Sequence, residues 1–168
     1  MSIAGGPIFQ LGWVVPDIAS ATAEFAERYG VDGWFTIPEV RFGPPTCRYR
    51  GCPAEYTSAV ALGYAGGQQL ELIEPRSGDS PYSDHLTRFG AGLHHIAYVP
   101  DDFDAALAGA RAAGVEIVAE GGFEEFGMEF AYLDGGSIGT CVELMRLSAR
   151  MKAVFDRLVP EGHANPWT

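Results

Sequence analysis

The stretch GLHHIAYVPDDFDAALAGARAAG (residues 92–114) decides how this chain folds. An apolar run comes first, then Pro-Asp-Asp, and then apolar residues at three- and four-residue steps. That spacing is typical of a helix with one buried face, whereas the apolar run before it is typical of a strand. Asp101 or Asp102 can cap the start of the helix, and Gly114 can end it. The stretch therefore predicts a strand followed by an amphipathic helix.

The same pattern occurs earlier, in FQLGWVVPDIASATAEFAERYG (residues 9–30). Strand-like segments follow each copy, and glycine pairs at 66–67 and 135–136 mark hairpin turns. The predicted strands are 33–40, 54–65 and 68–75 in the first half, and 115–121, 128–134 and 140–147 in the second. Each half thus has the order βαβββ, which predicts an α+β fold with two related modules, at about 8–75 and 92–147.

We assign residues 1–147 to one domain and residues 148–168 to a C-terminal helix and tail. Ser148 can cap that helix, whose apolar stripe comprises Met151, Val154, Phe155 and Leu158. The first module is longer than the second, and the additional residues lie near FGPPTCRYRGCP (42–53), which is rich in proline and glycine and predicts a loop. Two interpretations of this loop are equally open: it contacts a substrate, or it covers a sheet edge.

Composition excludes several classes of partner. The formal charge of −11 argues against binding to nucleic acid or to an anionic membrane surface. The N-terminus lacks the pattern of a signal peptide. Three cysteines without a C-x-x-C pair favour a reduced, cytoplasmic protein rather than one with a Cys47–Cys52 disulfide or a zinc-thiolate site.

Four polar residues interrupt apolar strands at matching places in the two halves. Strand alternation puts Gln10, Glu71, His95 and Glu143 on one face of the sheet. Each of them taken singly is more often a solvated, salt-bridged or core residue. Together, two carboxylates, an imidazole and an amide oxygen predict a divalent metal site, because buried carboxylates need a cation or another partner. The same alternation predicts that His94 faces the helices or a dimer edge, so that His94→Ala leaves metal binding largely intact.

The segments QLGWVVPDI, QLELIEP, GLHHIAYVPDD and CVEL resemble the vicinal oxygen chelate superfamily, the glyoxalase/bleomycin resistance/extradiol dioxygenase group. In sequence, these segments are most similar to methylmalonyl-CoA epimerase-like and glyoxalase-like members. The resemblance implies paired βαβββ modules that form a curved mixed sheet around a cleft. It implies Gln10, Glu71, His95 and Glu143 as metal ligands, Zn, Ni, Co or Mn as the ion, and a homodimer. Gln10 departs from the family pattern, because many members carry histidine there.

The function implied by the resemblance is a metal-dependent isomerase, epimerase or lyase that acts on a small carbonyl compound through an enolate. Glu143 is the first choice for the base and Glu71 the second. One alternative is a non-catalytic protein that sequesters an apolar small molecule. The other is a metal-dependent oxygenase, which the single histidine disfavours. The aromatic residues that can line the cleft are Phe35, Tyr56, Phe126, Phe130 and Tyr132. The arginines that could bind an anionic substrate are Arg48, Arg50 and Arg76.

Overall fold

The computed structural model describes residues 3–168, and its strands form a single ten-stranded mixed sheet. The first half contains β1 (Gln10–Val14), α1 (Ile18–Tyr29), β2 (Phe35–Phe42), β3 (Cys47–Tyr49), β4 (Cys52–Pro53), β5 (Tyr56–Ala65), β6 (Gln68–Ser77) and α2 (Pro81–Phe89). The second contains β7 (Gly92–Tyr98), α3 (Phe103–Ala112), β8 (Ile117–Phe123), η1 (Glu124–Phe126), β9 (Met128–Leu133), η2 (Gly136–Ile138), β10 (Cys141–Leu147) and α4 (Ala149–Phe155).

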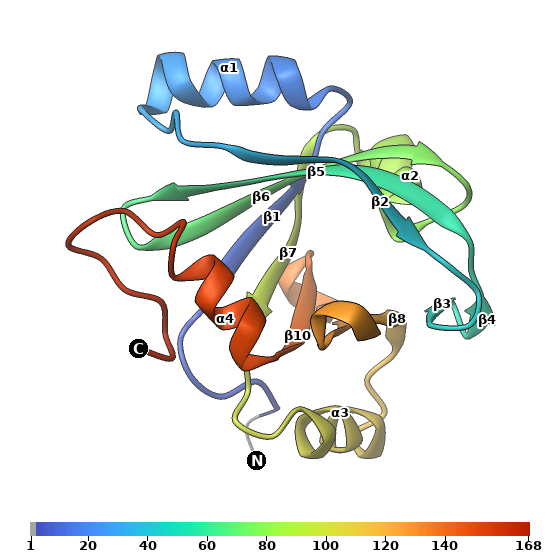
Figure 1. The fold of residues 1–168 in the computed structure, drawn as a ribbon. Coiled ribbons are helices and arrows are strands. Elements are labelled where there is room, and N and C mark those ends of the chain that lie inside the picture. Colours follow the sequence, from blue (N-terminus) through green and yellow to red (C-terminus); the bar gives the residue numbers. More distant parts are fainter. Residues whose placement is uncertain (1–2) are drawn as a thin grey trace.

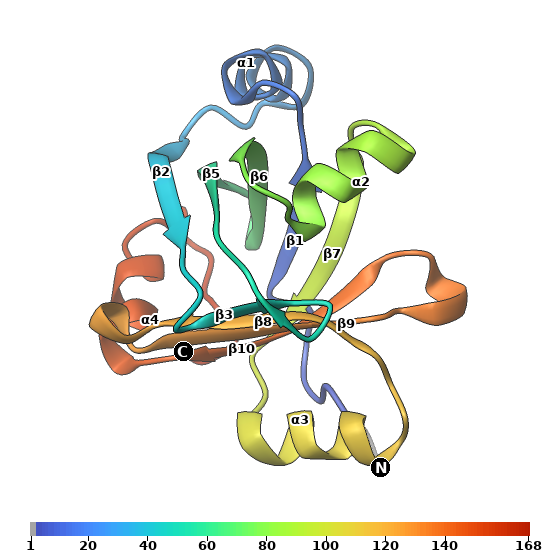
Figure 2. The ribbon, with the colours of Figure 1, turned by 90° about the vertical axis from the view of Figure 1, so that its right-hand side faces the viewer.

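The sheet order is β2-β5-β6-β1-β7-β10-β9-β8-β3-β4, so the repeated strands meet at its centre. β1 pairs with β7 in antiparallel fashion, and each is flanked by the last strand of its own half in parallel: β6 beside β1 and β10 beside β7. Figure 1 shows β1 and β7 side by side between the two halves, and Figure 2 shows β8 and β10 running across the direction of β5 and β6. The predicted α+β class, curled mixed sheet and C-terminal helix are confirmed.

The two repeated helices cover the outer faces of the sheet. The carboxylate of Asp17 accepts a hydrogen bond from the Ser20 amide at the start of α1, and Asp102 accepts one from Ala105 at the start of α3. Helix α1 packs on apolar residues that include Leu72, and α3 packs on residues that include Leu144. Figure 2 places these helices at opposite ends of the molecule, which leaves the inner faces of both halves turned toward each other.

The proline- and glycine-rich segment 42–53 covers a sheet edge. Within it, β3 pairs with β8 of the second half and so extends the sheet across the repeat. The Tyr49 hydroxyl donates a hydrogen bond of 2.6 Å to Asp84 of α2, and the Arg50 guanidinium lies 2.5 Å from the same carboxylate. This segment is therefore tied to both halves. Cys47, Cys52 and Cys141 are all free thiols.

The helix α2 was not among the predicted elements. Ser80 caps it in a capping box with Ser83, Pro81 occupies its first turn, and Gly90 ends it. These signals are present in the sequence, but the helix is short and its apolar pattern weak. Its buried Tyr82 points into the core, next to the site described below.

The C-terminal helix α4 begins after Ser148, as predicted, but ends at Phe155, before Leu158. Phe155 and Trp167 both pack against Phe9, with ring centroids 5.6 and 4.8 Å from that of Phe9. The C-terminal segment, drawn in red in Figure 1, is thereby fixed beside the start of β1. No helix within residues 3–168 combines the length and apolar character that crossing a membrane requires.

Candidate metal centre

Four polar side chains from the four central strands meet inside the molecule. Nε2 of His95 lies 3.3 Å from Oε1 of Gln10, 3.4 Å from Oε2 of Glu71 and 3.3 Å from Oε2 of Glu143. Gln10, His95 and Glu143 are buried, while the Glu71 side chain keeps 16% exposure. The structure thus brings together all four residues that the sequence singled out. Their role as metal ligands stays a prediction.

Strand register explains why these side chains meet. Gly12 on β1 is paired with Glu71 on β6 and with His95 on β7. Gln10 lies two residues before Gly12 and therefore on the same face. Glu143 on β10 is paired with Ala97, two residues from His95, and again shares its face. Four rigid strands hold the donor groups.

Gly12 makes room for the imidazole. A Cβ atom at this position would lie 2.6 Å from Nδ1 of His95 and closer still to the ring carbon Cε1. The ring therefore lies directly on the Gly12 backbone. A glycine inside a strand often marks such a close approach.

We expect Gly12→Ala to displace the His95 ring and destabilise the protein by about 1–3 kcal/mol through overpacking. Urea denaturation of the variant measures the loss. Gly33→Ala is the matched control, because a Cβ atom at Gly33 meets nothing within 4 Å. Equal stability of the wild type and Gly12→Ala would contradict the described position of His95.

A β-bulge disrupts the alternation of side chains at the histidine pair. Gly12 is opposite His95 but the next residue, Trp13, is opposite Leu93, so His94 has no partner on β1. At a bulge two residues of one strand face one residue of the other, and the chain is re-aimed locally. His94 consequently lies in the interior, 4% exposed, with its Nδ1 3.0 Å from Nδ1 of His95. The His94 ring also packs against Tyr82 and His85 of α2, each at a centroid distance of 5.3 Å, so His94 does face a helix, although not one that was predicted. The expectation that alternation separates His94 from His95 is wrong.

The contact between the two histidines bears on the protonation of His95. Burial lowers the pKa of His94 well below its usual value, and the neighbouring His95 adds to this effect, so His94 is neutral. A neutral imidazole can accept a hydrogen bond at Nδ1. When His95 donates its Nδ1 proton to His94, its Nε2 lone pair is directed at the three oxygen atoms. His94 thus orients a predicted ligand, as second-shell groups do in metal sites.

The buried charges alter one another's pKa values. Burial raises the pKa of Glu143 to about 8, and the nearby Glu71 carboxylate contributes to the rise, while the charge of His95 opposes it. Burial alone would lower the pKa of His95, but the charges of Glu143 and Glu71 and the hydrogen bond with Glu71 outweigh it and raise that pKa. In the absence of a cation, the site therefore retains protons near neutral pH.

The donor set fits a divalent cation. Three oxygen donors and one imidazole nitrogen suit an octahedral ion with open positions. The 3.3–3.4 Å separations are close to the roughly 2.8–3.1 Å between adjacent ligands of an ion with bonds of about 2.0–2.2 Å. Oε2 of Glu143 is buried and makes no hydrogen bond. In residues 3–168 no group of three or more His, Cys, Asp or Glu side chains has the spacing of a preformed metal site, so a cation would replace the present contacts between side chains.

Aromatic side chains cover the site from within the sheet. The hydroxyls of Tyr82 and Tyr132 lie 2.9 Å apart, and the Tyr132 ring packs 5.1 Å from that of His95. Phe42 stacks on Tyr56 at 4.4 Å and contacts Phe130 at 5.9 Å. These five residues are all buried. They give the site an apolar, weakly hydrated surrounding.

Of the five aromatic residues expected to line the cleft, three are buried and two are exposed. Tyr56, Phe130 and Tyr132 lie in the interior, but Phe35 and Phe126 are 48% and 39% exposed at the surface. A separate cavity of about 500 Å³ lies between the 44–48 segment, α3 and strands β8 and β9; its lining includes Phe103, Glu120 and Phe130 but none of the four central polar residues.

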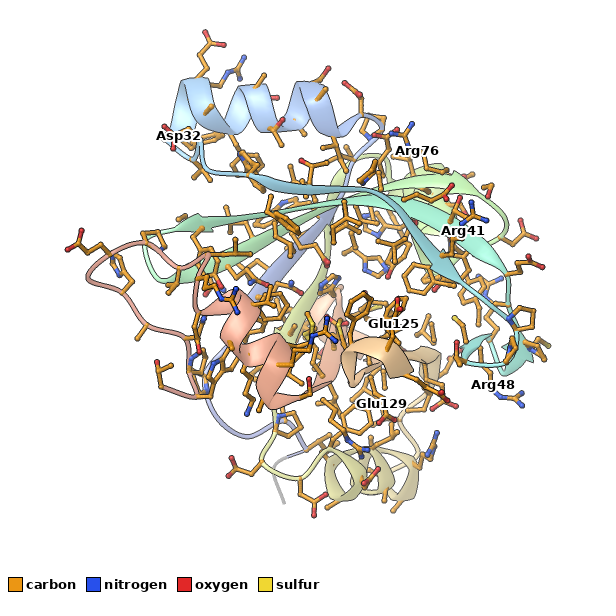
Figure 3. The ribbon with its side chains drawn as sticks, viewed as in Figure 1. Asp32, Arg41, Arg48, Arg76, Glu125 and Glu129 are labelled. Carbon is orange, nitrogen blue, oxygen red and sulfur yellow. The ribbon has the colours of Figure 1, made fainter. Side chains whose placement is uncertain are left out.

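The candidate arginines do not form a cationic patch. Arg50 pairs with Asp84, and Arg76 lies 2.9 Å from Glu74. Arg48 donates a hydrogen bond to the Gly51 carbonyl. Figure 3 shows Arg48 and Arg76 at the periphery and apart from each other, Arg76 near the top and Arg48 at the lower right.

Sequence reasoning missed several residues that shape the site. Gln69 lies two residues before Glu71, so strand alternation puts both on one face, but its contact with Gln10 was not anticipated. Gly12 carried a usable signal, since a glycine in the middle of a strand indicates a bulge or a close approach. Tyr82 carried none, because the helix on which it lies was not predicted.

Solved structures similar to this chain include methylmalonyl-CoA epimerases. A variant of the enzyme from Streptomyces coelicolor, in complex with 2-nitronate-propionyl-CoA, has a TM-score of 0.66 and 23% identity, covering 86% of this chain and 99% of that one. The epimerase from Mycobacterium tuberculosis has a TM-score of 0.62 and 20% identity over 91% of this chain and 95% of that one. These likenesses support the same fold.

Among curated proteins, the uncharacterized protein YqjC of Bacillus subtilis (strain 168) is 52% identical over 40 residues. That match spans 24% of this chain and 29% of the relative. A family model matches far more, residues 9–132. The chain belongs to the glyoxalase/bleomycin resistance protein/dioxygenase superfamily.

Proposed function

We propose that this protein is a metal-dependent isomerase, epimerase or lyase that acts on a small carbonyl compound through an enolate. One observation carries the proposal: three oxygen atoms converge on the buried Nε2 of His95, and one of them, Oε2 of Glu143, has no hydrogen-bond partner. Gln10, Glu71, His95 and Glu143 would hold the ion. When bound, a divalent ion polarises a carbonyl oxygen and stabilises the negative charge of an enolate.

Glu143 is the proposed base. A general base works best when its pKa is near the working pH, and burial raises the pKa of Glu143 toward that range. Its Oε2 atom makes no hydrogen bond and lies 3.3 Å from Nε2 of His95, and in its ionised form it could take an α-proton. Glu71, the more exposed carboxylate, is the second choice and marks the side from which a substrate enters.

The surroundings favour an apolar or aromatic carbonyl compound. The buried rings of Tyr56, Phe130 and Tyr132 make the interior around the site apolar, whereas Arg50 and Arg76 are already paired with carboxylates. A polyanionic carrier such as coenzyme A needs cationic groups, which the candidate arginines supply poorly. The formal charge of −11 also disfavours binding of a polyanionic carrier. A homodimer, expected from the family resemblance, belongs to this proposal and is checked by light scattering.

The test is α-proton exchange. The protein is stripped with a chelator, reloaded with Zn, Ni, Co or Mn, and incubated in D₂O with a panel of aromatic and aliphatic ketones, aldehydes and thioesters. The proposal predicts deuterium at the α-carbon, lost on stripping and restored on reloading. Tight binding of these compounds without exchange under any metal would instead support a sequestering protein. Oxygen consumption with Fe(II) would support an oxygenase.

Metal binding is expected to depend steeply on pH. Glu143 and His95 both have raised pKa values without a cation, that of Glu143 being about 8, so protons compete with the ion. Apparent affinity for Co²⁺ should therefore fall as pH is lowered from 8 to 6, by about tenfold or more per unit, and level off above about pH 8. Calorimetry in buffers of different ionisation enthalpy measures the protons released. Affinity independent of pH across this range would contradict the described burial of Glu143.

A further inference from the structure

A chain of buried hydrogen bonds joins the C-terminal segment to the candidate metal centre. Gln10 Nε2 donates to Gln69 Oε1 at 2.7 Å, and Gln69 Nε2 donates to the Tyr64 hydroxyl at 2.8 Å. That hydroxyl donates to Asn165 Oδ1 at 3.0 Å, and Asn165 Nδ2 donates to Asp156 Oδ1 at 2.8 Å. Gln10, Gln69, Tyr64 and Asn165 are all buried.

Asp156, at the outer end of this series of hydrogen bonds, determines which group donates and which accepts in each of them. An ionised carboxylate only accepts hydrogen bonds, so Asp156 requires the amide nitrogen of Asn165 to face it. The Tyr64 hydroxyl then faces two acceptors, the Asn165 oxygen at 3.0 Å and the Phe155 carbonyl at 3.4 Å, and its own oxygen is left for the nitrogen of Gln69. The orientation of each side chain in the series is therefore determined by the donor or acceptor that its outer neighbour presents. The last consequence is that Gln69 presents its oxygen to the nitrogen of Gln10.

We propose that Gln69 is a positioning residue that turns the Gln10 amide oxygen toward the cation site, and that Tyr64 and Asn165 hold Gln69 in the required orientation. The inference rests on the proposed function, since it concerns a ligand of the proposed metal. It extends that proposal to a residue that touches neither ion nor substrate.

The orientation of the Gln10 amide must be fixed because its two ends differ in chemistry. The two ends of a glutamine side chain are nearly equal in size, but only the oxygen can bind a cation. A flipped Gln10 would present an NH₂ group to the ion and to Nε2 of His95. In the observed orientation Gln10 Oε1 lies 3.3 Å from that nitrogen. The packing of Phe155 and Trp167 on Phe9 holds in place the C-terminal segment that carries Asp156 and Asn165.

The first experiment is a titration of the full-length protein with Co²⁺ alone, followed by calorimetry and by visible absorption. Gln69→Leu keeps the volume but removes the acceptor, and it should weaken Co²⁺ binding about 10–100-fold, as loss of a second-shell partner does. The same substitution in a Gln10→Glu background should change the affinity by only about threefold or less, because the two carboxylate oxygens are equivalent. Such non-additivity reports coupling between the two residues.

A second pair of variants separates positioning from simple stability. Tyr64→Phe and Tyr49→Phe each remove a tyrosine hydroxyl that makes a tertiary hydrogen bond, the latter to Asp84. Both should lower the unfolding temperature. Only Tyr64→Phe should weaken Co²⁺ binding, by about three- to tenfold, when titrated well below that temperature.

The outcomes distinguish this inference from the function on which it rests. A wild type that binds Co²⁺, with Gln69→Leu unchanged or equally weakened in both backgrounds, overturns the positioning role alone. A wild type that binds no Co²⁺ overturns the metal proposal and this inference with it. Weakening confined to the Gln10 background supports both.

Discussion

His95→Ala is expected to weaken divalent metal binding by more than about 100-fold, beyond the range typical of second-shell changes. Nε2 of His95 lies within 3.4 Å of oxygen atoms from all three other polar residues. Without the imidazole, Glu71 and Glu143 are left as a carboxylate pair beside one amide. Calorimetric titration with Zn²⁺ and Co²⁺ measures the loss, and circular dichroism verifies that the variant is folded.

The remaining histidines provide graded controls. His94→Ala removes the Nδ1 contact with His95 and the ring contacts with Tyr82, His85 and Tyr132, but no predicted ligand, and should weaken binding by about tenfold. His163→Ala, at an exposed position in the tail, should have no effect. Equal losses for His94→Ala and His95→Ala, or a larger loss for His94→Ala, would mean that the register of β7 is misassigned.

Glu143→Gln is expected to reduce turnover by about 10²–10⁴-fold, the usual contribution of a general base, while substrate binding is kept. Glutamine retains an oxygen for the ion and nearly the same shape, but it cannot take a proton from carbon. Assays at saturating metal separate this effect from weaker ion binding. The α-proton exchange rate on a responsive carbonyl compound is the measurement.

Glu129→Gln is the matched control on the neighbouring strand. Glu129 is exposed and pairs with Arg146, so its neutralisation should leave exchange unchanged. Exchange retained in Glu143→Gln but lost in Glu71→Gln would transfer the role of base to Glu71. Exchange retained in both variants would contradict a carboxylate base in this site.

Strand alternation and the internal repeat were sufficient to predict the central architecture. Gln10, Glu71, His95 and Glu143 occupy matching positions in the two halves, and a period of two placed them on one face. The arrangement of the two modules in one curved sheet was implied by the family resemblance, and the structure adds the pairing of β1 with β7. The sequence could not reveal how closely the four side chains approach one another, because this depends on register between strands distant in the chain.

The errors have local physical causes. His94 and His95 were assigned to opposite faces, but their Nδ1 atoms lie 3.0 Å apart, because a bulge adds a residue to β7 opposite Gly12 and periodicity assumes that no residue is added. Helix α2 was missed because nine residues give too short an apolar pattern. Gln69 was not predicted to contribute, because its hydrogen bond to Gln10 joins residues 59 positions apart that only the folded chain brings together.

Metal content after reloading tests the central claim most directly. Purified protein is stripped with a chelator, loaded separately with Zn, Ni, Co and Mn, freed of excess metal by gel filtration, and analysed by inductively coupled plasma mass spectrometry, with His95→Ala prepared in parallel. If the four polar residues bind a metal ion, the wild type will hold about one ion per chain for at least one metal, and His95→Ala will hold close to none. A wild type without a near-stoichiometric ion under any of the four metals, or a variant that retains it, would contradict the account.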